Sequence, residues 1–151
     1  MSGNSNLVFL VRQWLEKARA DMELARFLSN EGVKFLDAIC FNCQQAAEKY
    51  LKAYLTYRQI HFPKTHDLEG LLGLIEPVDR KLVKGLLDVP RLSPYGVEIR
   101  YPGDVPKATA SEAKSALYLA EKTERKILAA LSPAISPKAN AKSKNSKKNA
   151  H

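Results

Sequence analysis

The chain has little cysteine, and this limits the kind of site it can hold. Cys40 and Cys43 are the only two cysteines among 151 residues, so a reducing, cytoplasmic setting is the default expectation. They form a lone C-x-x-C inside a helical pattern. Zinc needs four ligands, and the nearby His61 and His66 do not have zinc-ligand spacing to this pair. We therefore predict two core thiols and no metal or cofactor, with a redox or metal role as the less favoured alternative.

Long apolar runs and targeting signals are also absent. No apolar run of 18 residues occurs, so no membrane span is expected. The N-terminal residues have no basic region followed by a clean apolar stretch, so no signal peptide is expected either. The sequence contains no P-loop, no G-x-S-x-G and no H-E-x-x-H. The residues alone therefore do not indicate an enzyme.

Acidic residues are missing from the last twenty positions. The net charge is +8, and residues 132–151 carry five of the lysines, at positions 138, 142, 144, 147 and 148. This segment is too poor in apolar groups to offset the entropy cost of ordering it. We predict one folded domain over residues 1–131 and a disordered, Lys-rich tail over 132–151. Such a tail can hold RNA or DNA loosely, although a purely solubilising role is favoured.

Apolar residues recur with helical spacing along most of the folded part. The pattern predicts helices over residues 7–30, 33–60 and 78–88, and a last helix that begins near Thr109. No convincing strand is present, and the connections between the helices are short. The sequence therefore predicts an all-α fold, an antiparallel up-and-down bundle of four to five helices.

Two sequence signals mark helix starts. Thr65 is expected to cap a third helix, which follows residues 61–64. Thr109 and Glu112 match a capping box, in which the two side chains satisfy each other's free backbone amides.

The helix expected over residues 33–60 has a polar side opposite its broad apolar face. Gln45, Lys49 and Lys52 gather there, with Glu48 beside them. This stripe is interpreted as part of a nucleotide or RNA surface, and an ordinary solvated helix face is the alternative.

The segment Pro90–Pro106 is the longest interruption between helical regions. It contains four of the eight prolines, and because proline fixes φ and removes a donor, no helix is expected here. At its centre Arg100 stands beside Tyr101 and Pro102. A guanidinium and an aromatic ring on a stiffened turn suit the binding of a phosphate and the stacking of a base. The alternative is a plain proline-rich connector.

Three motifs, taken in order, resemble the HEPN domain. They are Phe41–Leu55 (FNCQQAAEKYLKAYL), Thr65–Leu68 (THDL) and Arg100–Pro102 (RYP), and a closing helix rich in alanine and glutamate follows. The similarity extends from about residue 8 to 131. It implies an all-α bundle that usually dimerises and that binds nucleotides or RNA. It also implies a possible partner, a minimal nucleotidyltransferase, in a toxin–antitoxin-like system.

One feature of the resemblance is missing. Many HEPN domains are metal-independent ribonuclease toxins, in which an arginine and a histidine a few residues later meet across the dimer. Here no histidine follows Arg100 until His151. The Arg-Tyr-Pro form therefore resembles the non-nuclease, nucleotide-binding branch. In that branch Arg100 would pair with phosphate, Tyr101 would stack or hydrogen-bond, and Pro102 would hold the turn.

These considerations give one preferred interpretation and two alternatives. We expect a non-catalytic nucleotide- or RNA-binding homodimer, with apolar positions such as Leu55 suggesting a second buried contact on the long helix. The first alternative is a metal-independent endoribonuclease toxin that uses Arg100 and His66, and the second is an interaction or adaptor domain without a ligand. The predicted binding residues are Arg100, Tyr101, Pro102, Gln45, Lys49, Lys52 and His66.

Overall fold

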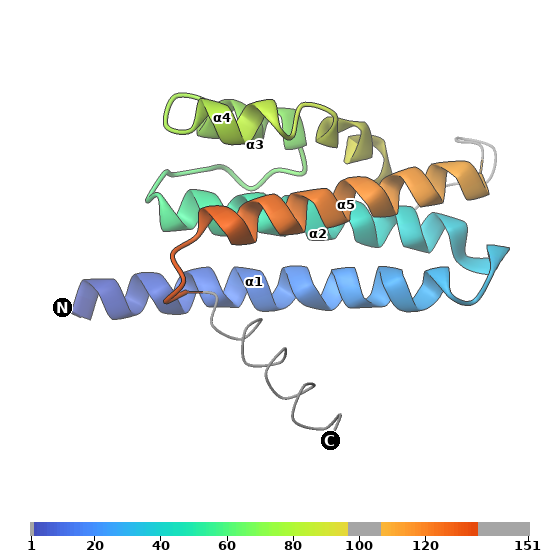
Figure 1. Ribbon diagram of the computed structural model, residues 1–151, viewed down its shortest axis with the longest axis horizontal. Helices are drawn as coiled ribbons and strands as arrows, with labels where there is room; N and C mark the ends of the chain where they lie inside the picture. Colours follow the sequence, from blue (N-terminus) through green and yellow to red (C-terminus); the bar gives the residue numbers. More distant parts are fainter. Residues whose placement is uncertain (1, 97–106, 136–151) are drawn as a thin grey trace, which may run out of the picture.

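The computed structural model describes residues 2–96 and 107–135, and within these ranges it contains helices and no strand (Figure 1). The prediction of an all-α fold is confirmed. In chain order the elements are α1 (Ser2–Ser29), the 3₁₀ helix η1 (Val33–Phe35), α2 (Leu36–Tyr57), α3 (Leu68–Ile75), α4 (Arg80–Lys84), the 3₁₀ helix η2 (Val89–Gly96) and α5 (Ala110–Ala130).

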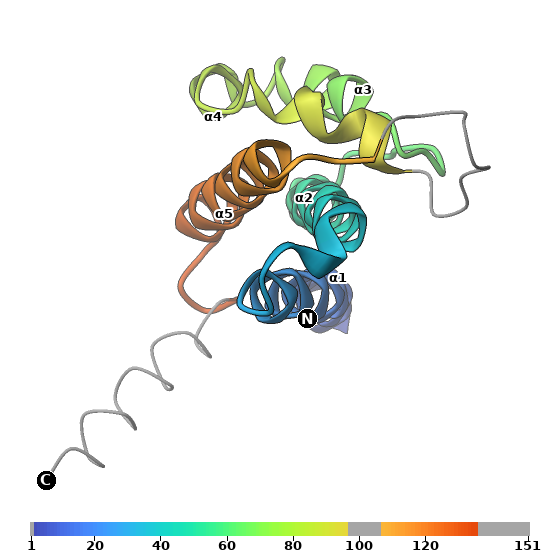
Figure 2. The ribbon, with the colours of Figure 1, turned by 90° about the vertical axis from the view of Figure 1, so that its right-hand side faces the viewer.

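The central element is α2, which contacts α1, α5, α3 and η2. Viewed along the bundle, α1 lies on one side of α2, while α3, α4 and η2 lie on the other side (Figure 2). The α2 residues Tyr50, Leu51, Tyr54 and Leu55 are all at least 98% buried. Burial of each such side chain contributes about 1.5–3 kcal/mol, so α2 supplies much of the core.

The expectation that Leu55 forms a contact between two copies is wrong. Its side chain is fully buried inside the single chain, because α2 is covered by helices on more than one side. A position can lie outside the main apolar stripe of a helix and still face another element of the same domain. Cys40 and Cys43 are fully buried as well, which confirms their prediction as core thiols.

The long helix expected over residues 33–60 is shorter than predicted at both ends. It opens with the 3₁₀ turn η1 and ends at Tyr57 in a Schellman motif. The amide of Ile60 donates to the Leu55 carbonyl at 2.8 Å, and the amide of Gln59 donates to the Thr56 carbonyl at 3.0 Å. Gln59 adopts φ 57°, a conformation usually given to glycine. Because no glycine or proline marks this end, the sequence did not show it.

The prediction that Pro90–Pro106 holds no helix is wrong for its first part. Residues Val89–Gly96 form η2, and Pro94 lies inside it. A 3₁₀ helix accepts the φ that proline imposes, and its hydrogen bonds have poorer geometry than those of an α-helix, so the loss of one donor costs less. Val89 and Leu92 are fully buried, so packing holds this turn in place. Residues 97–106 lie outside the described residues.

The two predicted helix starts have different outcomes. The N-cap residue of α3 is Asp67, and Thr65 lies two residues earlier, where its hydroxyl accepts the Asp67 amide at 3.0 Å. Thr65 therefore orders the turn before α3 and does not cap the helix. The capping box of α5 is confirmed, because Thr109 Oγ1 accepts the Glu112 amide at 3.0 Å and Glu112 Oε1 accepts the Thr109 amide at 3.2 Å.

The described chain continues past α5 to residue 135. Arg12 of α1 donates from Nη2 to the Ala134 carbonyl at 2.9 Å, and Ile135 is 6% exposed. The first residues of the segment predicted to be a tail thus pack against α1, while residues 136–151 lie outside the described residues. Within the described ranges, no helix is long and apolar enough to cross a membrane.

We predict that Thr109→Ala lowers the free energy of unfolding by about 1 kcal/mol, because an alanine leaves the Glu112 amide without its cap. Urea unfolding followed by circular dichroism measures the change. Ser111→Ala is the matched control, since Ser111 is exposed in the same turn and its loss should cost less than about 0.5 kcal/mol. Equal effects of the two substitutions would contradict the capping role.

Candidate functional site

A line of polar residues runs along α2 at four-residue spacing, and it is buried. Gln44 is fully buried, Glu48 is 3% exposed and Lys52 is 6% exposed. Residues spaced by four lie on one face of a helix, so these three side chains form a continuous polar row inside the protein. Charged residues are seldom buried unless they are paired.

The carboxylate of Glu48 is the centre of this row. Its Oε2 accepts the Lys52 ammonium at 3.0 Å. Its Oε1 accepts the amide of Gln44 at 3.2 Å and contacts Nδ1 of His66 at 2.6 Å. Gln44 also donates to the backbone carbonyl of His66 at 3.3 Å. We refer to Gln44, Glu48, Lys52 and His66 as the Glu48 cluster.

The ammonium of Lys52 has aromatic as well as carboxylate partners. It lies 5.6 Å from the ring centroid of Trp14 and 5.9 Å from that of Phe62. The two rings meet edge to face at 6.1 Å. A cation near aromatic faces gains electrostatic stabilisation where little water is present. Lys52 is therefore a structural cation that neutralises Glu48, and its burial leaves it little contact with a ligand.

His66 is the member of the cluster that reaches the surface. Its side chain is 68% exposed, whereas that of Glu48 is 4% exposed. An ionised carboxylate can only accept hydrogen bonds, so Nδ1 of His66 carries the proton that is donated to Glu48. Among the described residues Nε2 has no assigned partner, and it is available to a ligand. A buried carboxylate thus fixes both the tautomer and the orientation of an exposed imidazole.

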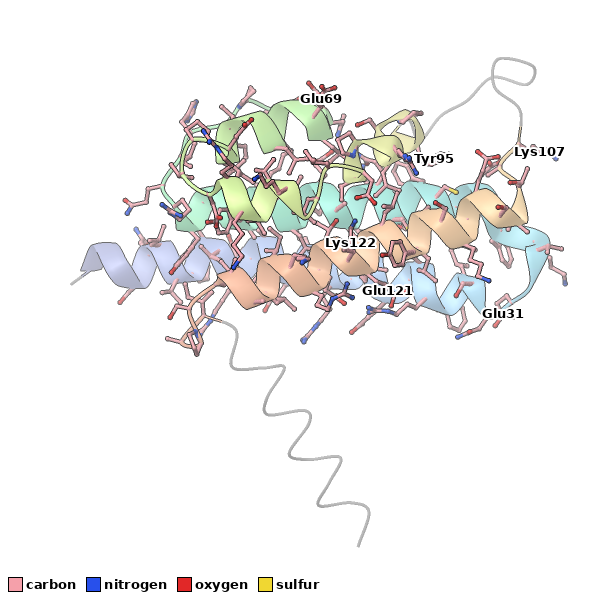
Figure 3. All side chains as sticks on the ribbon, turned by 45° about the horizontal axis from the view of Figure 1, so that its top comes forward. Glu31, Glu69, Tyr95, Lys107, Glu121 and Lys122 are labelled. Carbon is pink, nitrogen blue, oxygen red and sulfur yellow. The ribbon has the colours of Figure 1, made fainter. Side chains whose placement is uncertain are left out.

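Both flanks of residues 97–106 are fixed near the Glu48 cluster and the start of α5. Gly96 packs so closely on Gln44 that a Cβ at this position would lie 3.1 Å from the side-chain amide carbon. After the gap, the amide of Ala108 donates to Asp37 of α2 at 2.8 Å. Tyr95 and Lys107 lie at the same end of the molecule (Figure 3).

A further contact joins η2 to α5. The hydroxyl of Tyr95 donates to Glu112 Oε2 at 2.9 Å, which is the second oxygen of the capping-box carboxylate. This bond and the backbone amide of Thr109 lower the pKa of Glu112. Gly96, the residue before the segment that contains Arg100, packs on Gln44 of the Glu48 cluster. The segment is followed by the capped start of α5.

The structure separates the predicted site residues into three groups. Arg100, Tyr101 and Pro102 lie outside the described residues. Lys52 and His66 belong to the Glu48 cluster, and Gln45 adjoins it by donating to Gln44 Oε1 at 2.7 Å.

Lys49 lies apart from the cluster. Its ammonium pairs with Asp21 of α1 at 2.5 Å. The interpretation of the polar stripe as a solvated face is wrong for Lys52, which is buried against Trp14, Phe62 and Glu48.

Sequence reasoning missed Gln44 and Glu48 as members of the site. A signal was present, because Gln44, Glu48 and Lys52 follow one another at intervals of four residues. Opposite charges at this spacing form an ion pair on one helix face, and such a pair can be buried. The contact between Glu48 and His66 joins positions 18 residues apart, and no local pattern indicates it.

A cavity and the thiol of Cys43 are weaker candidates for a functional site. A cavity of about 320 Å³ lies where the α1–α2 corner meets the first half of α5, and its lining includes Val33, Leu36, Ile39 and Leu117. It is mostly apolar, so it lacks the converging polar groups that a nucleotide requires. Burial raises the pKa of the Cys43 thiol, and a protonated, buried thiol is a poor nucleophile and a poor metal ligand.

The model of the HEPN domain matches residues 11–128. The crystal structure of TT1696 from Thermus thermophilus superimposes with a TM-score of 0.61 at 29% identity, over 80% of this chain and 98% of that chain. No curated protein matches.

We predict that Glu48→Gln lowers the free energy of unfolding by about 3 kcal/mol, because it leaves the buried Lys52 ammonium without its counter-charge. The double variant Glu48→Gln/Lys52→Met should recover most of this loss. Urea unfolding measures both. The matched control is Asp21→Asn, which breaks the more exposed pair with Lys49 and should cost less than about 1 kcal/mol. A double variant as unstable as Glu48→Gln would contradict the role assigned to Lys52.

Proposed function

The chain belongs to the HEPN domain family, and from this premise we propose that it is a non-catalytic module that binds the phosphate groups of a nucleotide or of RNA. The observation that carries the proposal is the Glu48 cluster. It holds an exposed imidazole in one orientation, beside the point where the segment with Arg100 leaves η2.

Each residue has a distinct role in this proposal. His66 offers Nε2 to a phosphate oxygen, as a donor when the ring is protonated, while Glu48 holds the ring through Nδ1. Arg100 supplies a planar guanidinium that can grip two phosphate oxygens. Tyr101 stacks on a base or hydrogen-bonds, and Pro102 stiffens the turn. Gln45 and Lys49 have smaller roles, since Gln45 is engaged by Gln44 and Lys49 by Asp21.

The absence of a histidine shortly after Arg100 favours binding over cleavage. Pairing with a nucleotidyltransferase rests on the family resemblance alone, and it stays a prediction. Its simplest test is co-purification with such a protein from the native source.

We predict that Arg100→Ala and His66→Ala each weaken phosphate binding about tenfold or more, because each removes a charge-assisted hydrogen bond worth about 1.5–3 kcal/mol. Calorimetric titration with ATP, GTP and a short single-stranded RNA measures the affinity. His61→Ala and Arg91→Ala are the matched controls, since both residues are exposed and neither belongs to the Glu48 cluster. If the unmodified protein binds none of the three ligands, the proposal is wrong.

A second candidate function, metal-independent ribonuclease, is favoured by one observation. The contact between Nδ1 of His66 and Glu48 at 2.6 Å is the kind of contact that holds a general base in its productive tautomer. Nε2 would remove the proton from a ribose 2′-hydroxyl, whose oxygen would attack the adjacent phosphorus. The bond to the 5′ oxygen would break, and that oxygen would take a proton from water. Arg100 would stabilise the charge on the phosphoryl oxygens.

If this second function operates, 5′-labelled RNA incubated with the protein in EDTA is cut to fragments that end in a 2′,3′-cyclic phosphate. We then expect His66→Ala to slow the cleavage at least about 100-fold. DNA of the same sequence should stay intact because it lacks the attacking hydroxyl. Intact RNA after prolonged incubation, or cleavage unchanged in His66→Ala, would eliminate this candidate and leave the binding module.

A further inference from the structure

The side of the molecule formed by α4, η2 and α5 exposes two large apolar side chains. Leu87, in the turn between α4 and η2, is 68% exposed, and Tyr118 of α5 is 60% exposed. Figure 2 shows α4 and α5 along the same side of the bundle. The two elements touch where the side chain of Lys126 lies against Gly85, since a Cβ at Gly85 would be 3.3 Å from Cε of the lysine. Exposed apolar side chains that lie close together and are rimmed by polar groups indicate an interaction site.

The ammonium of Lys122 connects the surroundings of these two side chains. It pairs at 2.5 Å with the carboxylate of Asp88, the residue next to Leu87. The same ammonium lies over the ring of Tyr118, 5.7 Å from the ring centroid. Tyr118 and the segment that holds Leu87 are therefore neighbours on the surface, although they are about 30 positions apart in the sequence.

Tyr118 lies in the middle of a basic stripe on α5. Lys114 comes one turn before it, Lys122 one turn after it, and Arg125 two turns after it. Residues that are separated by four or seven positions lie on the same face of a helix. The exposed tyrosine ring is thus surrounded by cations of its own helix.

Most of these positive charges are not offset within the protein. Glu121, the nearest acid to Tyr118 in the sequence, pairs with Arg26 of α1 at 3.4 Å. Figure 3 shows Glu121 and Lys122 on opposite sides of α5. Five exposed cations on this side of the molecule form no ion pair with a described residue: Lys84, Arg91, Lys114, Arg125 and Lys126. We refer to these five cations with Leu87 and Tyr118 as the α4–α5 face.

An acidic protein segment fits the α4–α5 face better than RNA or a membrane does. Bases of single-stranded RNA stack on exposed aromatic rings, but Lys122 lies over the ring of Tyr118 and Leu87 offers no ring. A helix that lies in a membrane surface presents a continuous apolar face, which two separate side chains do not provide. A protein interface has apolar groups at its centre and charged groups around them, and tyrosine and arginine are common anchors in it.

We propose that the α4–α5 face docks an acidic segment of a partner protein. Aliphatic side chains of the segment pack on Leu87 and Tyr118, and its carboxylates pair with the surrounding cations. Opposite charges speed the encounter and orient the partner, and the apolar contacts at the centre slow its release. No residue of the Glu48 cluster belongs to this face, so the proposal does not depend on the proposed function.

Fluorescence anisotropy with a labelled synthetic peptide tests the apolar centre of the face. The peptide has about 20 residues, with leucines at helical spacing and glutamates at most other positions. We expect a dissociation constant on the order of 10 μM, and Leu87→Ser/Tyr118→Ser should raise it at least about tenfold. The matched control Phe9→Ser/Leu10→Ser removes two side chains of α1 that are 57% and 47% exposed, and it should leave the affinity unchanged.

Reversal of charge tests the rim of the face. Arg91→Glu/Arg125→Glu should raise the dissociation constant at least about tenfold, because like charges would then meet across the contact. Lys17→Glu/Lys34→Glu changes the net charge by the same amount at exposed positions elsewhere, and it should raise the constant less than about twofold. Circular dichroism verifies that all four variants remain folded.

Two further probes separate the proposed partner from other anionic ones. A peptide with serine in place of every leucine has the same charge and should bind at least about tenfold more weakly. A short single-stranded RNA and phosphatidylserine vesicles should bind Arg91→Glu/Arg125→Glu as they bind the unmodified chain. The proposal is overturned if the leucine peptide does not bind, or if its binding survives both variants of the face. It is also overturned if the RNA or the vesicles lose their binding in the charge-reversal variant while the peptide does not.

Discussion

The structure depends on the burial of the polar side chains of α2. Fourteen of its 22 residues are buried, and a buried polar group must find a partner or cost several kcal/mol. Between Glu48 and Tyr54, four of the polar side chains have partners in four different parts of the chain. Lys49 pairs with α1, Tyr50 donates to Glu124 of α5 at 2.6 Å, and Tyr54 donates to Asp79 at the start of α4 at 2.6 Å. Glu48 pairs with His66, which lies just before α3. The side chains on two turns of one helix thus fix how the surrounding elements are placed.

The same requirement explains why an exposed histidine is held in one orientation here. Glu48 is far more costly to bury than a leucine, and Lys52 offsets its charge without reaching solvent. The remaining oxygen is then free to hold an imidazole at the surface. An exposed histidine on a loop would ordinarily sample several rotamers, and the carboxylate below it removes that freedom. The arrangement gives the protein a fixed polar group at the point where the chain leaves η2 through Gly96. Phosphate binding and proton transfer both require such a group.

Much of the fold could be predicted from the sequence, and the site could be predicted less well. Apolar periodicity located the helices, and the Thr109–Glu112 pattern located the start of α5, because both signals are local. The sequence does not indicate the end of α2, because Gln59 adopts a left-handed conformation, with φ 57°, that is usual for glycine and not for glutamine. The sequence does not indicate η2, because proline ordinarily breaks a helix, whereas buried Val89 and Leu92 hold this segment in a 3₁₀ helix. Lys52 and His66 were selected for their charge, but the residue that joins them is Glu48, and their meeting depends on tertiary packing.

α1 differs from the other helices in exposing four large apolar side chains, those of Phe9, Leu10, Leu24 and Phe27. A helix that packs on only one side of a domain usually presents charged residues to solvent, and α1 does so in its middle part at Glu16, Lys17 and Glu23. The inner face of α1 already serves the core through Val11, Ala18 and Met22. The four exposed side chains near its ends therefore add little to the stability of the single chain, because hydrophobic stabilisation scales with the apolar area that is removed from water.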